Sequence, residues 1–210
     1  GDEIRAYRAT DGTELWNVTA FEADATVVVD GTLYAARGEY LHTYDLQTGA
    51  AGWSVDVNED VSLGLSAADG TVYATGRVND RDYAVYALNA SDGRERWRFE
   101  MEGPVTMPPV VTDGSVYLGG GSALRDQLTT DHDPTFYRLN ATDGHVEWVF
   151  DVNTRPTGAA VADGSVYLAS GNTVHALDAA TGQRAWRHRL PASLDHGLSY
   201  VRTDARSPAV

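Results

Sequence analysis

The chain has 210 residues, of which 42% are apolar and 10% aromatic, a balance that is typical of a globular protein and argues against disorder. Its formal net charge is −14 and it has no cysteine, which disfavours nucleic acid as a partner and excludes disulfides and thiolate metal sites. No apolar run reaches the roughly 18 residues of a membrane helix, so we expect no direct membrane span, and any export signal would lie outside this sequence.

A hairpin pattern recurs along the chain. An apolar run is followed by Asp-Gly and then by alternating β-branched and aromatic residues, as in the stretch VVVDGTLYAA. This pattern predicts two antiparallel strands joined by a type I′ turn, which needs a positive φ at both central residues. The four copies are Val27–Ala36, Ser66–Thr75, Val110–Gly119 and Ala160–Ala169.

A second motif alternates with these hairpins and occurs five times. Each of the five tryptophans has a glycine four residues before it, in a second tight turn. The five pairs are Gly12 and Trp16, Gly49 and Trp53, Gly93 and Trp97, Gly144 and Trp148, and Gly182 and Trp186. Each unit therefore reads as strand A, Asp-Gly turn, strand B, loop, strand C, tight turn and strand D.

Four short antiparallel strands, repeated every 40 to 50 residues or so, predict an all-β fold, a β-propeller of four-stranded blades. One such sheet cannot bury both of its faces, so the blades must stack on one another. We expect a partial ring of about 4.5 blades, with a closed five-bladed ring as the alternative. The expected boundaries are a half blade at 1–19, blades at 20–57, 58–101, 102–151 and 152–190, and a further blade or closing strand at 191–210.

The tryptophan motif resembles the tryptophan-docking motif of the PQQ-like, or quinoprotein-type, β-propeller repeat family, A-x-[DN]-x-x-[TS]-G-x-x-x-W. The resemblance implies that each indole is held between the alanine of its own motif and the glycine peptide of the adjacent one, in a ring that usually has seven or eight blades. Six positions depart from the pattern. Arg8 replaces Asp or Asn, Thr43 and Arg138 replace the alanine, and repeats one, three and four have Asp in place of Thr or Ser before the glycine. We expect weaker docking where the motif is substituted.

The resemblance implies two different functions. Quinoprotein dehydrogenases of this family hold pyrroloquinoline quinone and Ca²⁺, whereas other members are scaffolds, including the subunit that assists outer-membrane protein assembly. This chain has no cysteine pair and no matching catalytic cluster. We therefore expect a non-catalytic binding scaffold, exported or at the cell surface, with no catalytic residue, no cofactor and no metal. The alternatives are a fragment of a PQQ- and Ca-dependent dehydrogenase and a ligand-sensing domain of a larger receptor or kinase.

A binding face is expected at one end of the blades. Strand direction alternates, so the A–B and C–D turns lie at one end and the longer, variable B–C and D–A connections at the other, and function usually lies on variable loops. The alternative is that these charges are merely solvated. The segment Asp131–Asp133 offers two carboxylates and an imidazole but no fixed geometry, and His42 and His175 share a strand position that suggests packing. The candidates are Arg77, Asp80, Arg81, Arg125, Asp131, His132, Asp133 and Arg155.

The charged residues are unusual in kind. All 16 basic residues are arginine, and 21 of the 30 acids are aspartate. This composition resembles that of proteins from extreme halophiles and suggests a haloarchaeal source, where salt shortens the screening length to about 3 Å at 1 M. An archaeal source would exclude the outer-membrane role and leave an interaction scaffold, whose partner is a protein or a small ligand. Open blade edges would invite self-association.

Overall fold

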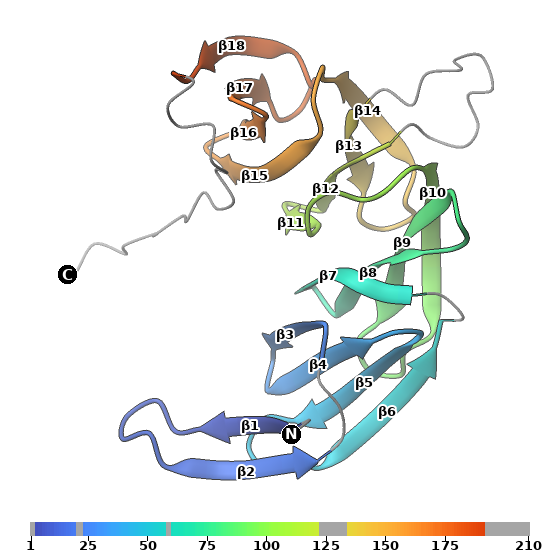
Figure 1. The fold of residues 1–210 in the computed structure, drawn as a ribbon, viewed down its shortest axis with the longest axis vertical. Coiled ribbons are helices and arrows are strands. Elements are labelled where there is room, and N and C mark those ends of the chain that lie inside the picture. The colour runs from blue at the N-terminus through green and yellow to red at the C-terminus, as the bar shows by residue number, and fades with distance from the viewer. Residues whose placement is uncertain (1–2, 20–22, 58–59, 122–133, 192–210) are drawn as a thin grey trace.

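The structure is a computed structural model and describes residues 3–19, 23–57, 60–121 and 134–191. The regular secondary structure in these ranges consists entirely of β-strands (Figure 1). The strands form one two-stranded and four four-stranded antiparallel sheets. This arrangement confirms the all-β fold and the four-stranded blades. The described residues contain no apolar helix of membrane-spanning length.

The five sheets follow one another along the chain, and within each of the four-stranded sheets the strands pair in sequence order. Sheet 1 contains β1 (Glu3–Tyr7) and β2 (Glu14–Thr19); sheet 2 contains β3 (Ala25–Val29), β4 (Thr32–Arg37), β5 (Tyr40–Asp45) and β6 (Ala51–Asp56). Sheet 3 contains β7 (Asp60–Ala68), β8 (Thr71–Arg77), β9 (Asp82–Asn89) and β10 (Glu95–Glu102). Sheet 4 contains β11 (Val110–Thr112), β12 (Ser115–Gly120), β13 (Thr135–Asn140) and β14 (Val146–Asp151). Sheet 5 contains β15 (Pro156–Ala162), β16 (Ser165–Ser170), β17 (Thr173–Asp178) and β18 (Arg184–Arg189).

The sheets are arranged along an arc. Figure 1 shows sheets 1 and 5 at its two ends, with the first strands of sheets 2 to 5 on the concave side. These first strands contact one another in order, β3 with β7, β7 with β11 and β11 with β15. The described residues therefore form an open arc of blades and not a closed five-bladed ring.

The turns between the first two strands of the blades have the predicted geometry. In each Asp-Gly pair the aspartate has a φ between 47° and 50° and the glycine a φ between 68° and 75°, as a type I′ turn requires. An aspartate tolerates this left-handed conformation better than most residues, and glycine has no side chain to oppose it. The four pairs are Asp30–Gly31, Asp69–Gly70, Asp113–Gly114 and Asp163–Gly164.

The core lies between the blades. Four apolar clusters are buried, and each of them joins two consecutive sheets. In the cluster between sheets 3 and 4, Val85 and Met101 pack with Leu118 and Leu139, all of them inaccessible to solvent. Because a blade buries its faces only against its neighbours, stability follows from the stacking of successive units.

Each of the first four tryptophans lies against the glycine of the next repeat. A Cβ atom placed on Gly144 would lie 2.5 Å from Cε3 of Trp97, so only a residue without a side chain fits there. Each indole N–H also donates a hydrogen bond of 2.9–3.0 Å to the carbonyl three residues before that glycine. The donor and acceptor pairs are Trp16 and Leu46, Trp53 and Ala90, Trp97 and Ala141, and Trp148 and Ala179.

The two ends of this series differ from its interior. Trp186 is 48% exposed, whereas Trp97 is 7% exposed. A Cβ atom on Gly12 would meet no other described residue within 4 Å. Among the described residues, therefore, the last tryptophan has no glycine partner and the first glycine has no tryptophan.

The substituted motif positions make contacts of their own. Arg138 lies directly across the ladder from Trp148, and its Nη1 donates to the carbonyls of Ala179 and Ala180 at 2.9 and 3.2 Å. Thr43 donates its hydroxyl to the carbonyl of Trp53 at 2.8 Å. The side chain at this position can thus support the neighbouring backbone, and weaker docking in these two repeats stays a prediction.

The Asp or Asn of the motif holds the tight turn. Oδ1 of Asp45 accepts hydrogen bonds from both the hydroxyl and the backbone N–H of Thr48, each at 2.8 Å, and these bonds lower the pKa of Asp45. In the first repeat, where Arg8 stands in this position, Asp11 accepts the equivalent bonds from Thr13. The first turn is therefore held by a different carboxylate.

Candidate binding site

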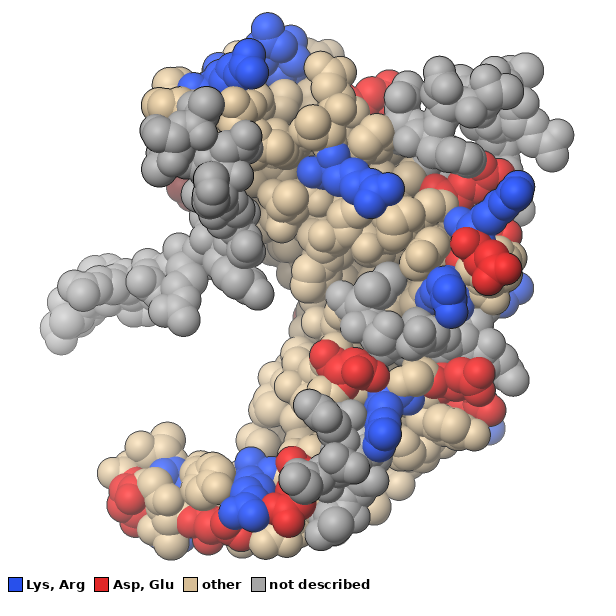
Figure 2. All heavy atoms as spheres, viewed as in Figure 1, with Lys and Arg blue, Asp and Glu red and all other residues tan. Residues whose placement is uncertain are grey.

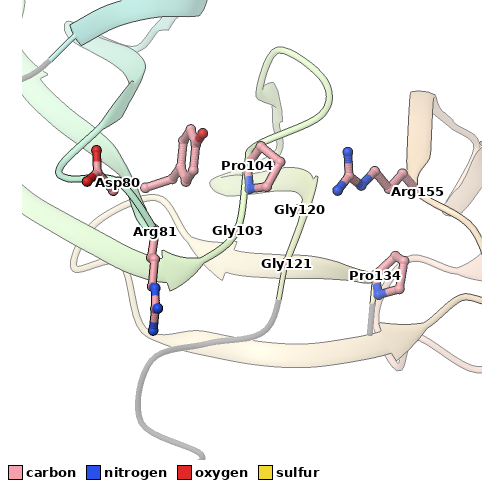
Figure 3. Close-up of a pocket in the computed structure, with 9 residues that line it drawn as sticks. Asp80, Arg81, Gly103, Pro104, Gly120, Gly121, Pro134 and Arg155 are labelled. Carbon is pink, nitrogen blue, oxygen red and sulfur yellow. The ribbon is translucent and has the colours of Figure 1, made fainter. Parts of the chain in front are cut away.

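Four of the eight residues predicted for the binding face are described by the structure. Asp80, Arg81 and Arg155 line one pocket of about 500 Å³ (Figure 3). Arg77 is exposed at the end of β8 and does not line this pocket. The other four candidates, Arg125, Asp131, His132 and Asp133, lie outside the described residues.

The pocket is formed where several connections meet. Asp80 and Arg81 lie between β8 and β9, and Arg155 lies between β14 and β15. These are B–C and D–A connections, the two kinds on which the binding face was predicted. The remaining lining residues are Tyr83, Gly103, Pro104, Gly120, Gly121 and Pro134.

Much of the pocket wall is backbone held in place by hydrogen bonds. Asn79 Oδ1 accepts from the N–H of Arg81 at 2.9 Å, and the Arg81 carbonyl accepts from Gly103 N–H at 2.8 Å. The Tyr137 hydroxyl donates to the Gly121 carbonyl at 2.7 Å. Gly121 also approaches the backbone of Glu102 so closely that no Cβ atom would fit. The wall is therefore fixed before any partner binds.

The charged side chains rim this backbone surface. Figure 3 shows Arg155 extending toward Pro104 and Gly120, while Asp80 and Arg81 point in different directions from their loop. None of the three forms an ion pair with another residue in the described part of the chain. A pocket of this volume with a few polar groups at its rim is typical of a ligand or peptide site.

The described residues do not provide the ligands for the calcium ion of the quinoprotein enzymes. Within them, no three His, Asp or Glu side chains lie close enough together to hold a metal ion. Hard cations such as Ca²⁺ take six to eight oxygen ligands, several of them carboxylates.

Sequence reasoning missed the wall of the pocket. Tyr83 and the prolines carry no motif, and the run Gly119–Gly121 suggests only a phosphate loop, which would need a following lysine and helix. The signal in that run is instead steric. A Cβ atom on Gly119 would collide with Pro156, and one on Gly120 would lie 2.5 Å from Sδ of Met101.

The two histidines of strand C occupy packing positions. Burial lowers the pKa of both His42 and His175. For His175, the nearby charges of Arg184 and Arg187 lower it further. The His175 ring is 8% exposed and meets the ring of Phe150 edge-on, with 5.4 Å between centroids.

We expect His175 to titrate below the ordinary histidine value of about 6.5. Because its neutral form is favoured in the folded state, the stability it contributes is present above that value and is lost as the pH falls through the folded pKa. An NMR titration of the imidazole resonances measures this pKa directly. A His175 pKa at or above 6.5 would contradict the burial and arginine effects.

Comparisons with known proteins agree with this architecture. A family model described as "Outer membrane protein assembly factor BamB" matches residues 1–80 and 37–208. The serine/threonine-protein kinase AfsK of Streptomyces griseus is 31% identical over 189 residues, which cover 83% of this chain and 22% of the kinase. The outer membrane protein assembly factor BamB of Yersinia pestis is 26% identical over 174 residues, covering 74% of this chain and 40% of that protein. The chain thus spans less than half the length of these relatives.

Two solved structures share the fold. The crystal structure of BamB from Moraxella catarrhalis superposes with a TM-score of 0.66 at 19% identity, covering 90% of this chain and 56% of that one. The quinohemoprotein alcohol dehydrogenase ADHIIG of Pseudomonas putida superposes with a TM-score of 0.68 at 17% identity, covering 87% of this chain and 38% of that one. The family model matches nearly the whole sequence, and the sheets superpose on those of these propellers. The chain therefore belongs to the PQQ-like β-propeller repeat family, whose model carries the BamB description.

Proposed function

We propose that this chain is a non-catalytic binding platform, exported or at the cell surface, that engages a protein partner at the end of the blades where Asp80, Arg81 and Arg155 meet. The observation that carries the proposal is that these three charged residues, from two connections, line one pocket with a fixed backbone wall and form no ion pair within the described part of the chain. The family model's description as an assembly factor supports a role in protein interaction.

A capture experiment tests this proposal. The 210-residue chain is immobilised, and proteins bound from the membrane and secreted fractions of its source are quantified by mass spectrometry. Replacing Arg155 with glutamate should reduce capture of the specific partner about tenfold, because reversing a central charge costs more than the ~1.4 kcal/mol that a tenfold change represents.

The matched control is Arg94→Glu. Arg94 lies on a C–D turn, at the opposite end of the blades, and its side chain is 87% exposed, so the net charge changes equally at a site far from the pocket. Capture by this variant should equal that of the unmodified chain. A partner that binds the Arg155 variant at full strength would place the interface elsewhere and refute the proposed face.

A ligand-sensing domain of a larger protein is the second candidate. The observation that favours it is the similarity to AfsK kinases of two Streptomyces species, at 31% and 32% identity over more than four fifths of this chain. The two candidates differ in what occupies the pocket. The sensor is supported if the chain captures no protein but a small molecule raises its melting temperature. The same molecule should not raise the melting temperature of the Arg155→Glu variant.

A further inference from the structure

The last strand, β18, carries a charge pattern that the other repeats lack. The pattern concerns three positions in each repeat: two residues before the tryptophan, one residue after it and three residues after it. In β18 all three are arginine, namely Arg184, Arg187 and Arg189. In the other repeats they are Glu14, Asn17 and Thr19; Ala51, Ser54 and Asp56; Glu95, Arg98 and Glu100; and Val146, Val149 and Asp151. The earlier repeats therefore serve as internal references, and none has more than one arginine here.

The register of the sheet brings these three side chains to one face. Alternate residues of β17 share one face of the sheet. The three residues of β17 on the face of His175 are each paired with an arginine of β18. A register shift next to Trp186 is what pairs Arg184 with this face. The pairs are Thr173 with Arg189, His175 with Arg187, and Leu177 with Arg184. Leu177 packs in the cluster between sheets 4 and 5, so this face is turned toward sheet 4.

These residues line a second pocket, between sheets 4 and 5, of about 550 Å³. The connection after β14 contributes Asn153 and Thr154, and the turn between β16 and β17 contributes Asn172. Thr154 is fixed by a hydroxyl–hydroxyl hydrogen bond of 2.7 Å to Ser170. Figure 2 shows basic side chains gathered at the end of the molecule where Figure 1 places β18.

Within the described lining, the positive charge of this pocket exceeds the negative charge. In the third repeat Arg98 is paired with Glu100 at 3.1 Å, but in β18 the residue equivalent to Glu100 is Arg189. In the described part of the chain, none of the three arginines of β18 forms an ion pair or a side-chain hydrogen bond. Asp151 is the one acidic residue in the described lining, so three guanidinium charges meet a single carboxylate.

An unpartnered buried group points to the same pocket. His175 lines it and is 8% exposed, and its Nδ1 has no hydrogen-bond partner among the described residues. Buried polar atoms are almost always hydrogen-bonded, so this nitrogen is available to a ligand in the pocket. Burial and the charges of Arg184 and Arg187 lower the pKa of this ring and so favour its neutral form. A neutral imidazole has one N–H, which can donate a hydrogen bond to an oxyanion.

We propose that this pocket binds a small molecule carrying a phosphate group, such as a phosphate monoester. Arg187 and Arg189 contact the phosphate oxygens, His175 donates a hydrogen bond, and Thr154 and Asn172 meet the hydroxyl-bearing body of the ligand. Three guanidinium groups against one carboxylate leave a net charge that matches a dianion, and the arginine fork fits phosphate oxygens in pairs. The volume exceeds that of a phosphate ion and leaves room for an organic body.

The test is a titration of the 210-residue chain with inorganic phosphate and with glycerol 3-phosphate at low ionic strength, followed by calorimetry and by the imidazole resonances of His175. Both probes should bind saturably and move those resonances, whereas sodium chloride at matched ionic strength should not. Tighter binding of glycerol 3-phosphate would identify an organic phosphate as the ligand, and equal affinities would identify free phosphate. Both results support the phosphate site.

The double variant Arg187→Gln/Arg189→Gln should weaken binding at least about tenfold, since each charged hydrogen bond contributes roughly 1.5–3 kcal/mol. The matched control is Arg98→Gln, at the repeat position of Arg187 but paired with Glu100, and it should bind like the unmodified chain. Both replaced residues are exposed on β18, and circular dichroism checks that the double variant is folded. If it is not, each single variant replaces it.

Two results would overturn the proposal: no saturable binding of either probe by the unmodified chain, or equal loss of binding in the Arg98 control. The outcome is independent of the partner interface, because Arg155 does not line this pocket. The Arg155→Glu variant should bind phosphate normally even if it captures no protein.

Discussion

Replacing Gly144 with alanine should destabilise the chain by about 2–5 kcal/mol. Gly144 has a φ of 73°, where an alanine costs about 1–2 kcal/mol. The new methyl group would also lie 2.5 Å from Trp97, and forcing a packed side chain to move typically costs a further 1–3 kcal/mol or so. The measurement is the urea midpoint of the 210-residue chain, followed by circular dichroism.

Gly12→Ala separates these two costs. Gly12 occupies the same motif position with a φ of 71°, but a Cβ atom there meets no described residue within 4 Å, so only the backbone term of about 1–2 kcal/mol applies. Gly164→Ala is a second control, in an interior Asp-Gly turn with a φ of 71° and the same open space. Equal losses in all three variants would show that contact with the tryptophan contributes nothing.

Replacing Trp97 with alanine should destabilise the chain by about 3–5 kcal/mol, which is typical of a buried tryptophan. Trp97 is 7% exposed, packs in the cluster between sheets 3 and 4, and donates to the carbonyl of Ala141. Its removal leaves a cavity between two blades and takes a donor from that carbonyl. Trp186 is 48% exposed, so Trp186→Ala should cost about 1 kcal/mol or less.

Urea unfolding of both variants checks this difference, and quenching by acrylamide gives a second readout. The exposed indole of Trp186 should account for most of the quenchable fluorescence. The quenching constant should therefore fall in the Trp186→Ala variant and stay unchanged in the Trp97→Ala variant. Similar destabilisation by both substitutions would mean that the contact with the following glycine is not what stabilises the stack.

The fold could be predicted because two local rules recur in it. An Asp-Gly pair between alternating residues specifies a type I′ hairpin wherever it occurs, and the four turns have the positive φ values that this requires. The glycine before each tryptophan marks a second turn, and together the two rules give the strand order of a blade. What spacing alone does not give is the curvature of the arc, since that depends on how side chains such as Met101 and Leu118 fill the space between sheets.

The site was harder to predict for a physical reason. Charges on the connections could be recognised, and Asp80, Arg81 and Arg155 meet at one pocket. Its wall, however, is made of backbone from segments that are distant in sequence. The glycines and prolines of these segments have no functional group that would mark them as part of a site. The phosphate pocket was missed because His175 was interpreted only as a packing residue, while its relation to Arg187 depends on the cross-strand register.

The way the indoles are received has a consequence for how such a chain can change. The N–H of each of the first four indoles binds a main-chain carbonyl, and each of these four rings lies on a glycine, so the contact between neighbouring blades uses groups that every repeat possesses. A blade can therefore be duplicated, removed or exchanged in whole units without redesigning its neighbours. The connections and the exposed positions of an individual strand, as in β18, remain free to acquire separate chemistry in each copy.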